Sequence, residues 1–152
     1  MSSKSLPTPS SSTKTFYATN SPWEGAYGHY RAIRVGQQIY VSGTTAADPD
    51  SPPENPRVLC PGDAHGQTRA TLNEIIKAIQ SLGGRGAESI VRTQLFIQRH
   101  EDAPAVMAGF TEVLGRQHGG DIGSTAILLV VSNFSDPDML VEIMVDAIAD
   151  AS

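Results

Sequence analysis

The sequence contains one cysteine, no surplus of basic residues and no long apolar run. A single thiol, Cys60, cannot form an internal disulfide, and any CxxC metal or redox motif is excluded by the count. The 11 lysines and arginines are outnumbered by 16 aspartates and glutamates and do not cluster, so we expect no nucleic acid partner. No run reaches the roughly 18 apolar residues of a membrane helix, so we expect no membrane partner and a soluble, cytoplasmic protein.

The first 14 residues, MSSKSLPTPSSSTK, are rich in serine and proline and have no apolar periodicity. Such a segment cannot bury enough surface to offset its ordering entropy, so residues 1–14 are predicted to form a disordered tail. A transit peptide is the alternative, although the segment holds two lysines, no arginine and no amphipathic stripe. The remaining residues, 15–152, have the length of one domain with a hydrophobic core.

A hairpin and a long loop are predicted next. Residues 32–42, AIRVGQQIYVS, consist of two β-rich runs around Gly36-Gln37, which is typical of a hairpin and would place Arg34 beside Ile39 on neighbouring strands. Residues 45–63 carry five prolines, which exclude a regular helix and disfavour a central strand. This segment is therefore predicted to be a surface loop.

Apolar periodicity predicts two amphipathic helices after the loop. Asp63 is a suitable N-cap for the first, which spans about five turns and ends at Gly83-Gly84, and Pro104 suits the first turn of the second. Three strands are predicted over residues 89–98, 125–131 and 140–149. The last two are expected to pair as a hairpin, which would place Glu142 beside the apolar strand. This order is typical of an α+β fold, a mixed β-sheet with two helices packed on one face.

One predicted strand is apolar on both faces. Residues 125–131, TAILLVV, carry no charge, yet two helices on the same side can cover only one face of the sheet. The second face therefore needs another partner, and self-association would supply it.

Four segments carry a family resemblance: SPWEGAYGHYRAIRVGQQIYVSGTT, PGDAHGQTRATLNEIIKAIQSLGG, SIVRTQLFIQ and DPDMLVEI. In order and spacing, from about Ser21 to Ala149, they resemble the RidA/YjgF family of small trimeric proteins. The resemblance implies a chorismate-mutase-like α+β subunit in a homotrimer, with small-molecule clefts at the subunit interfaces. It also implies enamine/imine deaminase-like activity, the hydrolysis of intermediates such as 2-aminoacrylate to a keto acid and ammonia. Some members are linked instead to ribonuclease activity or to specialised metabolic steps.

The resemblance also assigns residue roles, and one family residue is missing. In the family's deaminases, an arginine just before the penultimate strand holds the substrate carboxylate through its planar, bidentate guanidinium. Here the matching run from Gly123 to Ile127 contains no arginine and has Ala126 in that place. An imine that bears a carboxylate would therefore lack the arginine that usually binds this group during hydrolysis. Thr125, Ala126 and Ile127 are expected to form a substrate-contacting wall without charge.

Glu142 and His29 are the candidate catalytic residues. The family's acidic residue on the last strand is kept as Glu142, and its tyrosine before the first hairpin strand aligns with His29. A partly buried carboxylate rises in pKa and a histidine titrates near neutrality, so the two can act as an acid/base pair. The alternatives are a structural carboxylate and an exposed loop histidine. Further expected substrate contacts are Tyr30, Ser42 and Gly43, the latter two matching the family's SG pair, and Phe96.

Three functions remain open from the sequence. The first is a RidA-like enzyme that acts on an imine, enamine or enol-type metabolite by hydrolysis, or by a diverged isomerase, dehydratase or cyclase step. The second is a non-catalytic trimer that binds a metabolite or a protein. The third, a ribonuclease, is disfavoured by the acidic balance. We favour the enzyme, acting on a small-molecule substrate.

No metal and no cofactor are expected in the site. His65, His100 and His118 lack the spacing of metal ligands. Cys60 lies in the proline-rich loop without a recognisable acid/base neighbour, which disfavours a role as nucleophile.

Overall fold

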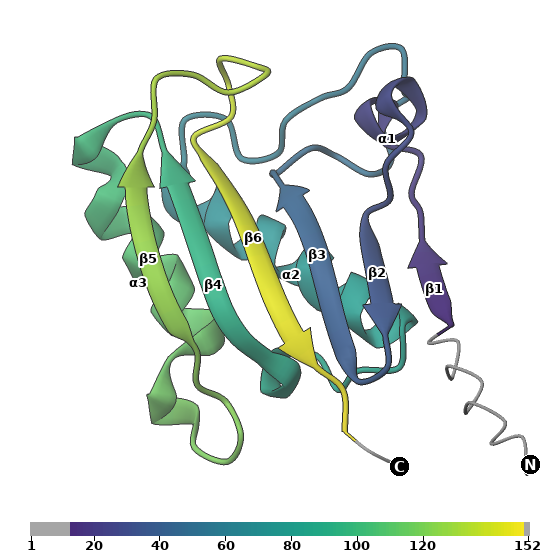
Figure 1. Cartoon of the computed structure of the whole chain (residues 1–152). Coiled ribbons are helices and arrows are strands. Elements are labelled where there is room, and N and C mark those ends of the chain that lie inside the picture. The colour runs from purple at the N-terminus through teal and green to yellow at the C-terminus, as the bar shows by residue number, and fades with distance from the viewer. Residues whose placement is uncertain (1–12, 151–152) are drawn as a thin grey trace, which may run out of the picture.

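Six strands form one mixed sheet in the order β1-β2-β3-β6-β4-β5, and the two long helices pack on one face of it (Figure 1). The computed structural model describes residues 13–150. The strands are β1 (Lys14–Tyr17), β2 (Ala32–Val35), β3 (Gln38–Thr44), β4 (Ile90–Ile97), β5 (Thr125–Val130) and β6 (Val141–Ile148). The helices are α1 (Pro22–Tyr27), α2 (Ala64–Ser81) and α3 (Ala103–Leu114), with short 3-10 helices at Ala87–Ser89, His100–Asp102 and Arg116–His118. The expected tail, residues 1–14, lies outside the described residues except for Thr13 and Lys14.

The predicted hairpin and the first long helix are confirmed. β2 and β3 pair in antiparallel register around Gly36-Gln37, with Arg34 opposite Ile39. The side chain of Asp63 accepts a hydrogen bond of 2.9 Å from the Gly66 N–H and so caps α2. The apolar stripe of α2 packs on the inner face of the sheet, and its buried members are Thr68, Leu72, Ile75, Ile79 and Leu82.

The predicted pairing of the last two strands is wrong. β5 lies beside β4 and runs parallel to it, whereas β6 is inserted between β3 and β4 and is antiparallel to both. The reason is the crossover through α3, because a strand that follows such a helix returns parallel to the strand before it. β5 is thereby left at the edge of the sheet, and β6, whose inner residues are buried, lies inside it. Glu142 is therefore separated from β5 by the whole of β4.

Two elements at the N-terminal end were not predicted. β1 pairs with β2 and extends the sheet by one edge strand. α1 is a single short helix that has Pro22 in its first turn and ends at Gly28, whose φ of 77° is the left-handed conformation that glycine adopts at low cost. The helix lies at the end of the sheet where β3 finishes and β6 begins (Figure 1).

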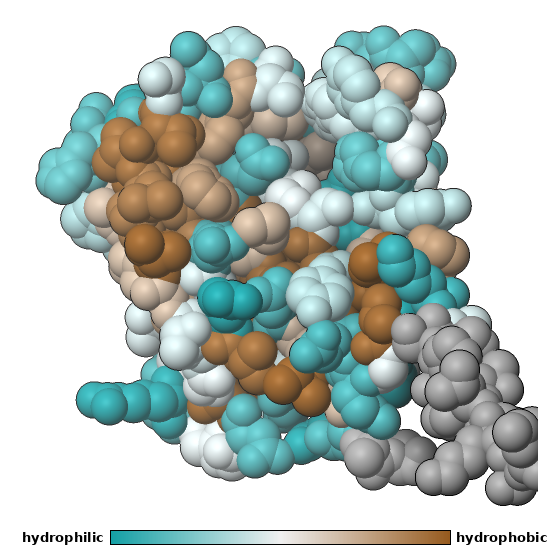
Figure 2. Space-filling model, in the orientation of Figure 1, coloured by the Kyte–Doolittle hydropathy of each residue, from teal (hydrophilic) through white to brown (hydrophobic). Residues whose placement is uncertain are grey.

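The outer sheet face and the β5 edge expose apolar side chains. On β5, the side chains of Ile127, Leu129 and Val130 are 49%, 45% and 51% exposed. Figure 2 shows apolar side chains gathered over this edge of the sheet. Elsewhere on the strands the exposed large apolar residues are Phe16, Tyr40, Val91, Met144 and Ile148. Between residues 13 and 150, every helix is too short or too polar to cross a bilayer.

Candidate functional site

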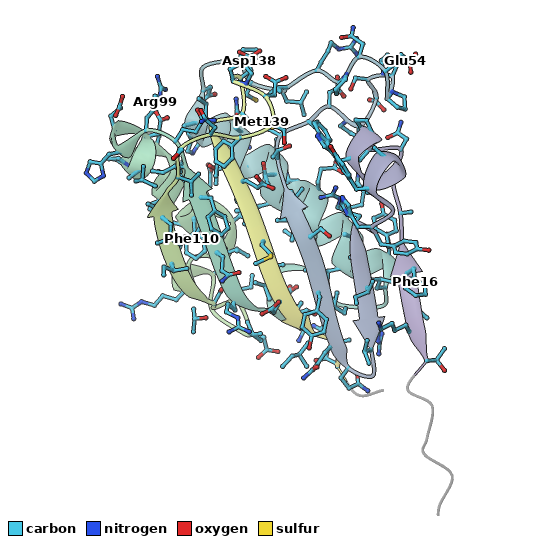
Figure 3. The ribbon with its side chains drawn as sticks, turned by 45° about the horizontal axis from the view of Figure 1, so that its top comes forward. Phe16, Glu54, Arg99, Phe110, Asp138 and Met139 are labelled. Atoms are coloured by element: carbon cyan, nitrogen blue, oxygen red, sulfur yellow. The ribbon has the colours of Figure 1, made fainter. Side chains whose placement is uncertain are left out.

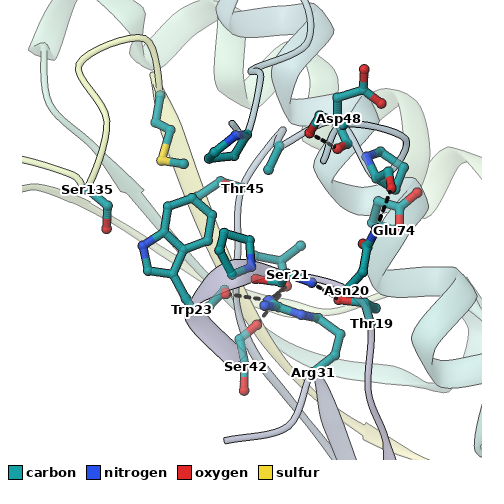
Figure 4. A pocket seen from close by; sticks show the side chains of 18 of the residues that line it. Thr19, Asn20, Ser21, Trp23, Arg31, Ser42, Thr45, Asp48, Glu74 and Ser135 are labelled. Carbon is teal, nitrogen blue, oxygen red and sulfur yellow. Dashed lines mark hydrogen bonds between the residues drawn. The ribbon is translucent and has the colours of Figure 1, made fainter. Parts of the chain in front are cut away.

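A cavity of about 350 Å³ lies between α1, the proline-rich loop and the adjoining ends of β3 and β6 (Figure 4). Four predicted site residues line it: His29, Ser42, Gly43 and Glu142. They come from the segment before β2, from the end of β3 and from the start of β6. Pairing of β3 with β6 thus brings Ser42 and Gly43 close to Glu142, about a hundred positions later in the chain.

A β-bulge shapes the floor of this cavity. Val41 pairs with Val145 and Thr44 with Ile143, so β3 has one more residue than β6 in this stretch. Such a bulge bends its strand and redirects the side chains beside it, here that of Ser42, which precedes Gly43. A Cβ atom built on Gly43 would overlap Oε1 of Glu142. Glycine at this position therefore allows the carboxylate to lie directly against the β3 backbone.

The carboxylate of Glu142 is directed into the cavity without a protein partner. Within residues 13–150 it takes part in no hydrogen bond and no ion pair. Burial raises its pKa above the ordinary value of 4.5, and the nearby positive charge of Arg31 partly offsets this shift. A carboxyl group with a raised pKa can donate a proton as well as accept one closer to neutral pH.

Arg31 is a cavity residue that the sequence analysis missed. Its Nε and Nη2 atoms each donate a hydrogen bond of 3.2 Å to Oε2 of Glu24, which is 5% exposed. Its Nη1 atom donates to the Gly43 carbonyl at 2.7 Å and to Oγ1 of Thr44 at 3.0 Å. Four of the five guanidinium N–H groups are thus used within the protein, which leaves little capacity for a bidentate contact with a ligand.

Glu24 also ties the preceding segment to α1. It accepts hydrogen bonds from the backbone N–H of Thr19, at 2.8 Å, and from the Thr19 hydroxyl. No periodic pattern could reveal this network, because α1 is too short to show one. The only sequence signal is an acidic residue within an otherwise apolar WEGAY segment.

The upper wall of the cavity is apolar. Trp23 of α1 faces the cavity in Figure 4. The other apolar lining residues are Pro22, Tyr27, Ala47, Pro49, Pro52, Pro56 and Met139. In Figure 3, Met139 lies just before β6, at the same end of the sheet as the proline-rich loop that carries Glu54. The cavity is therefore lined both by apolar side chains and by Glu142, which lies against the β3 bulge.

His29 and Tyr30 lie at the boundary with the open sheet face. His29 is exposed, and its Nδ1 is 3.2 Å from the Tyr30 carbonyl oxygen. The same oxygen accepts a 2.7 Å hydrogen bond from the Ser42 hydroxyl. No hydrogen bond joins His29 to Glu142 in the described part of the chain. Tyr30 does not line the cavity; its ring packs against Phe16, with ring centroids 4.5 Å apart, above a shallow depression on the outer sheet face.

The remaining predicted residues lie away from this cavity within one chain. Phe96 of β4 stands directly opposite Glu142 in the β4–β6 pairing, but it does not line the cavity. Thr125, Ala126 and Ile127 are exposed on β5, where Ala126 pairs with Thr93. The expected wall at residues 125–127 is therefore not part of the site that a single subunit forms.

The histidines and the cysteine set aside in the sequence analysis are dispersed. His65 lies 3.1 Å from a Glu112 carboxylate oxygen, and His118 contacts the Glu112 carbonyl. Cys60 is a free, exposed thiol. Among the residues that the structure describes, no three or more His, Cys, Asp or Glu side chains are grouped so as to hold a metal ion.

Comparison with known proteins identifies the family. The sequence model of the family described as Endoribonuclease L-PSP matches residues 19–149. An uncharacterized protein of Streptomyces coelicolor, SCO2049, is 31% identical over 129 residues, which cover 85% of this chain and 87% of that protein. The chain belongs to this family, which is the RidA/YjgF family that its motifs resemble.

Solved structures share the fold. Rv2704 from Mycobacterium tuberculosis, a member of the YjgF/YER057c/UK114 family, is similar with a TM-score of 0.73 and 26% identity, covering 90% of this chain and 100% of that one. The Rid-family protein YyfA from Yersinia pestis, of unknown function, has a TM-score of 0.70 and 24% identity with the same coverage. The predicted α+β class and RidA-like subunit are thereby confirmed.

Proposed function

We propose that this protein is a small-molecule enzyme in which Glu142 performs acid/base chemistry on an imine, enamine or enol-type metabolite. The observation that carries the proposal is the Glu142 carboxylate, which lacks a protein partner, has a raised pKa and faces a cavity of about 350 Å³. Desolvating a carboxylate without pairing it opposes folding, so such a group is a candidate for function rather than for stability.

Imine hydrolysis illustrates what this group can do. Protonated Glu142 donates its proton to the imine nitrogen, which makes the carbon more electrophilic. The resulting carboxylate accepts a proton from the water that attacks this carbon, which gives a carbinolamine and protonated Glu142. Glu142 then donates this proton to the amine nitrogen and takes up the proton of the new hydroxyl as the C–N bond breaks, which releases ammonia and a carbonyl product. Ser42 also lines the cavity, and its hydroxyl, which donates to the Tyr30 carbonyl, can still accept a hydrogen bond from the attacking water. The same proton transfers would serve an isomerisation or a dehydration.

The exposed apolar surface supports assembly as a homotrimer. β5 presents three large side chains that are about half exposed, and an apolar surface of this kind on an edge strand favours burial against another subunit. In such an assembly β5 of a neighbouring subunit would supply Thr125, Ala126 and Ile127 to the rim of the cavity. The uncharged wall that a single chain does not form would then be built between subunits.

Ribonuclease activity is the less favoured function, although the family model carries that description. The net charge is −5, and a nucleic-acid site requires a positive surface. Six arginines are held in ion pairs with acidic side chains: Arg31, Arg57, Arg69, Arg85, Arg92 and Arg99. Few basic groups are left to neutralise phosphates.

The test compares Glu142→Gln with the wild type. Imines are generated in the assay from a panel of amines and amino acids by added amine and amino-acid oxidases, with O2 as the electron acceptor, and the release of ammonia and carbonyl product is followed from pH 5 to 9. Glutamine keeps the shape but cannot transfer the proton, so the rate should fall by about 100- to 10,000-fold. Glu88→Gln, the same change at a half-buried position outside the cavity, should leave the rate unchanged. Full activity in Glu142→Gln would favour the alternative, a non-catalytic protein that binds a metabolite or another protein.

A further inference from the structure

We propose that the cavity selects substrates with a planar apolar group, such as an aromatic ring, and without a carboxylate. This inference rests on the proposed function and specifies its substrate class. The apolar group would pack on the indole of Trp23 and against the other apolar lining residues, the prolines of the loop and Met139. The reacting end of the molecule would then lie at Glu142.

The size of the cavity is the first argument. At about 350 Å³, its volume lies within the range of about 300–1,000 Å³ that is common for ligand pockets. A three-carbon imine would leave most of this space to water, whose share of liquid volume is about 30 Å³ per molecule. A substrate that displaces this water from the apolar wall gains the hydrophobic contribution that a smaller one forgoes.

Trp23 is the second argument, because it is placed as a ligand platform rather than as a core residue. It is half-buried on the short helix α1, lines the cavity, and makes no side-chain hydrogen bond within residues 13–150. The face of an indole ring stacks favourably on another planar ring. Pro49, Pro52 and Met139 also line the cavity and add to its apolar surface.

The distribution of charge is the third argument. The cavity contains one arginine, Arg31, and its charge is already compensated by the buried Glu24 at 3.2 Å. The acidic lining residues Asp48 and Glu74 are paired with Arg57 and Lys77. Among the described lining residues, Glu142 is therefore the only acidic side chain without an ion-pair partner, and the only other group without one that titrates near neutral pH is the exposed His29. A ligand carboxylate would meet repulsion from ionised Glu142 and find no arginine or lysine that is free to bind it.

The experiment measures the binding of three probes to the full-length protein: phenylacetamide, phenylacetate and acetamide. Phenylacetamide and phenylacetate both carry the ring and differ in charge. Phenylacetamide and acetamide both carry the uncharged amide and differ in the ring. Trp23 is the only tryptophan in the chain, so its fluorescence reports occupancy directly, and calorimetry gives the affinity independently. Phenylacetamide should bind about tenfold or more tightly than either of the other two.

Two variants show whether Trp23 is responsible. Trp23→Leu should weaken the binding of phenylacetamide by about tenfold, whereas Trp23→Phe, which keeps an aromatic wall, should retain most of it. Circular dichroism establishes that both variants are folded. Should Trp23→Leu unfold, Met139→Ala, which changes another apolar lining residue, takes its place and should weaken phenylacetamide binding in the same way. The inference is overturned if phenylacetate binds as well as phenylacetamide, if no probe binds, or if both wall variants bind like the wild type.

The Glu142→Gln variant separates this inference from the proposed function. Its amide can still face an uncharged ligand, so phenylacetamide should bind to it as to the wild type. Unchanged turnover in Glu142→Gln, together with binding that depends on Trp23, would refute the catalytic role and leave the substrate class standing. Loss of turnover without any dependence of binding on Trp23 would do the reverse.

Discussion

The ion pair between Arg31 and Glu24 is predicted to hold the N-terminal half of the site in place. The side chains are 11% and 4% exposed, and the pair joins α1 to the segment before β2. Replacing Arg31 with Met leaves the Glu24 carboxylate buried with only the hydrogen bonds from Thr19. Replacing Glu24 with Gln leaves a buried guanidinium with a neutral neighbour. Either change leaves one buried charge without its partner, and the desolvation of that charge lowers the free energy of unfolding.

The expected loss of stability is large for one substitution. Breaking a buried ion pair by removing one partner costs about 3–5 kcal/mol. For a chain of this length each kcal/mol shifts the melting temperature by about 2–4 °C, so the expected decrease is about 6–20 °C. The double variant Arg31→Met/Glu24→Gln removes both charges and should lose less than the sum of the two single variants, by about 0.5–3 kcal/mol.

Urea and thermal denaturation at one fixed protein concentration measure these differences, because assembly would make stability depend on concentration. The control is the pair of Arg57 with Asp48, in which the arginine is 59% exposed and the atoms are 3.5 Å apart. Arg57→Met should cost less than about 1 kcal/mol. If Arg31→Met and Glu24→Gln were no more destabilising than Arg57→Met, the reasoning about the buried pair would be refuted.

Three further predictions concern the other parts of the site. Burial raises the Glu142 pKa, so its contribution to stability is present below about pH 4.5 and is lost as pH rises through the raised value. Glu142→Gln should therefore melt higher than the wild type at pH 7 and at nearly the same temperature at pH 4; a difference that grows toward acid pH would contradict this. Gly43→Ala should displace the Glu142 carboxylate and lower turnover by about tenfold or more, while Gly25→Ala, which meets no atom within 4 Å, should not. Leu129→Lys on β5 should reduce the mass measured by light scattering from that of a trimer, and an unchanged mass would exclude β5 from the subunit interface.

The local sequence pattern correctly predicted those helices and strands whose stabilising contacts are with residues nearby in the chain. The β2–β3 hairpin follows from its β-rich runs and the turn at Gly36-Gln37. The start of α2 follows from the capping side chain of Asp63. In both cases the interactions that decide the structure join residues only a few positions apart, so periodicity and turn chemistry were sufficient.

The position of β6 in the sheet depends on contacts between distant parts of the chain, so local sequence pattern could not predict it. Its alternation shows which face is buried but not which strands flank it. The turn before β6 suggested a hairpin with β5, yet the crossover through α3 directs β5 to the far side of β4. The family resemblance located Glu142 correctly on the last strand, and only the structure shows that its neighbours are Gly43 on β3 and Phe96 on β4.

Arg31 illustrates a different limit. In the sequence it is one arginine among eight, and the absence of arginine at position 126 suggested a site without any cation. The structure places a guanidinium at the cavity, but this group does not replace the missing anchor. A carboxylate-binding arginine must present free N–H groups in a plane toward the ligand. Arg31 instead directs most of its N–H groups to Glu24, Gly43 and Thr44.

The same ion pair connects the fold of the site to its chemistry. Glu24 lies next to Trp23 on α1, so the contact with Arg31 fixes the apolar wall. The positive charge of Arg31 also lowers the pKa of Glu142, against the larger effect of burial. Removing Arg31 would therefore loosen the apolar wall and, by taking away this charge, raise the Glu142 pKa further. Under the proposed function, substrate affinity and the pH range of catalysis would both depend on one side chain that, in this arrangement, contacts neither the apolar group nor the reacting atoms.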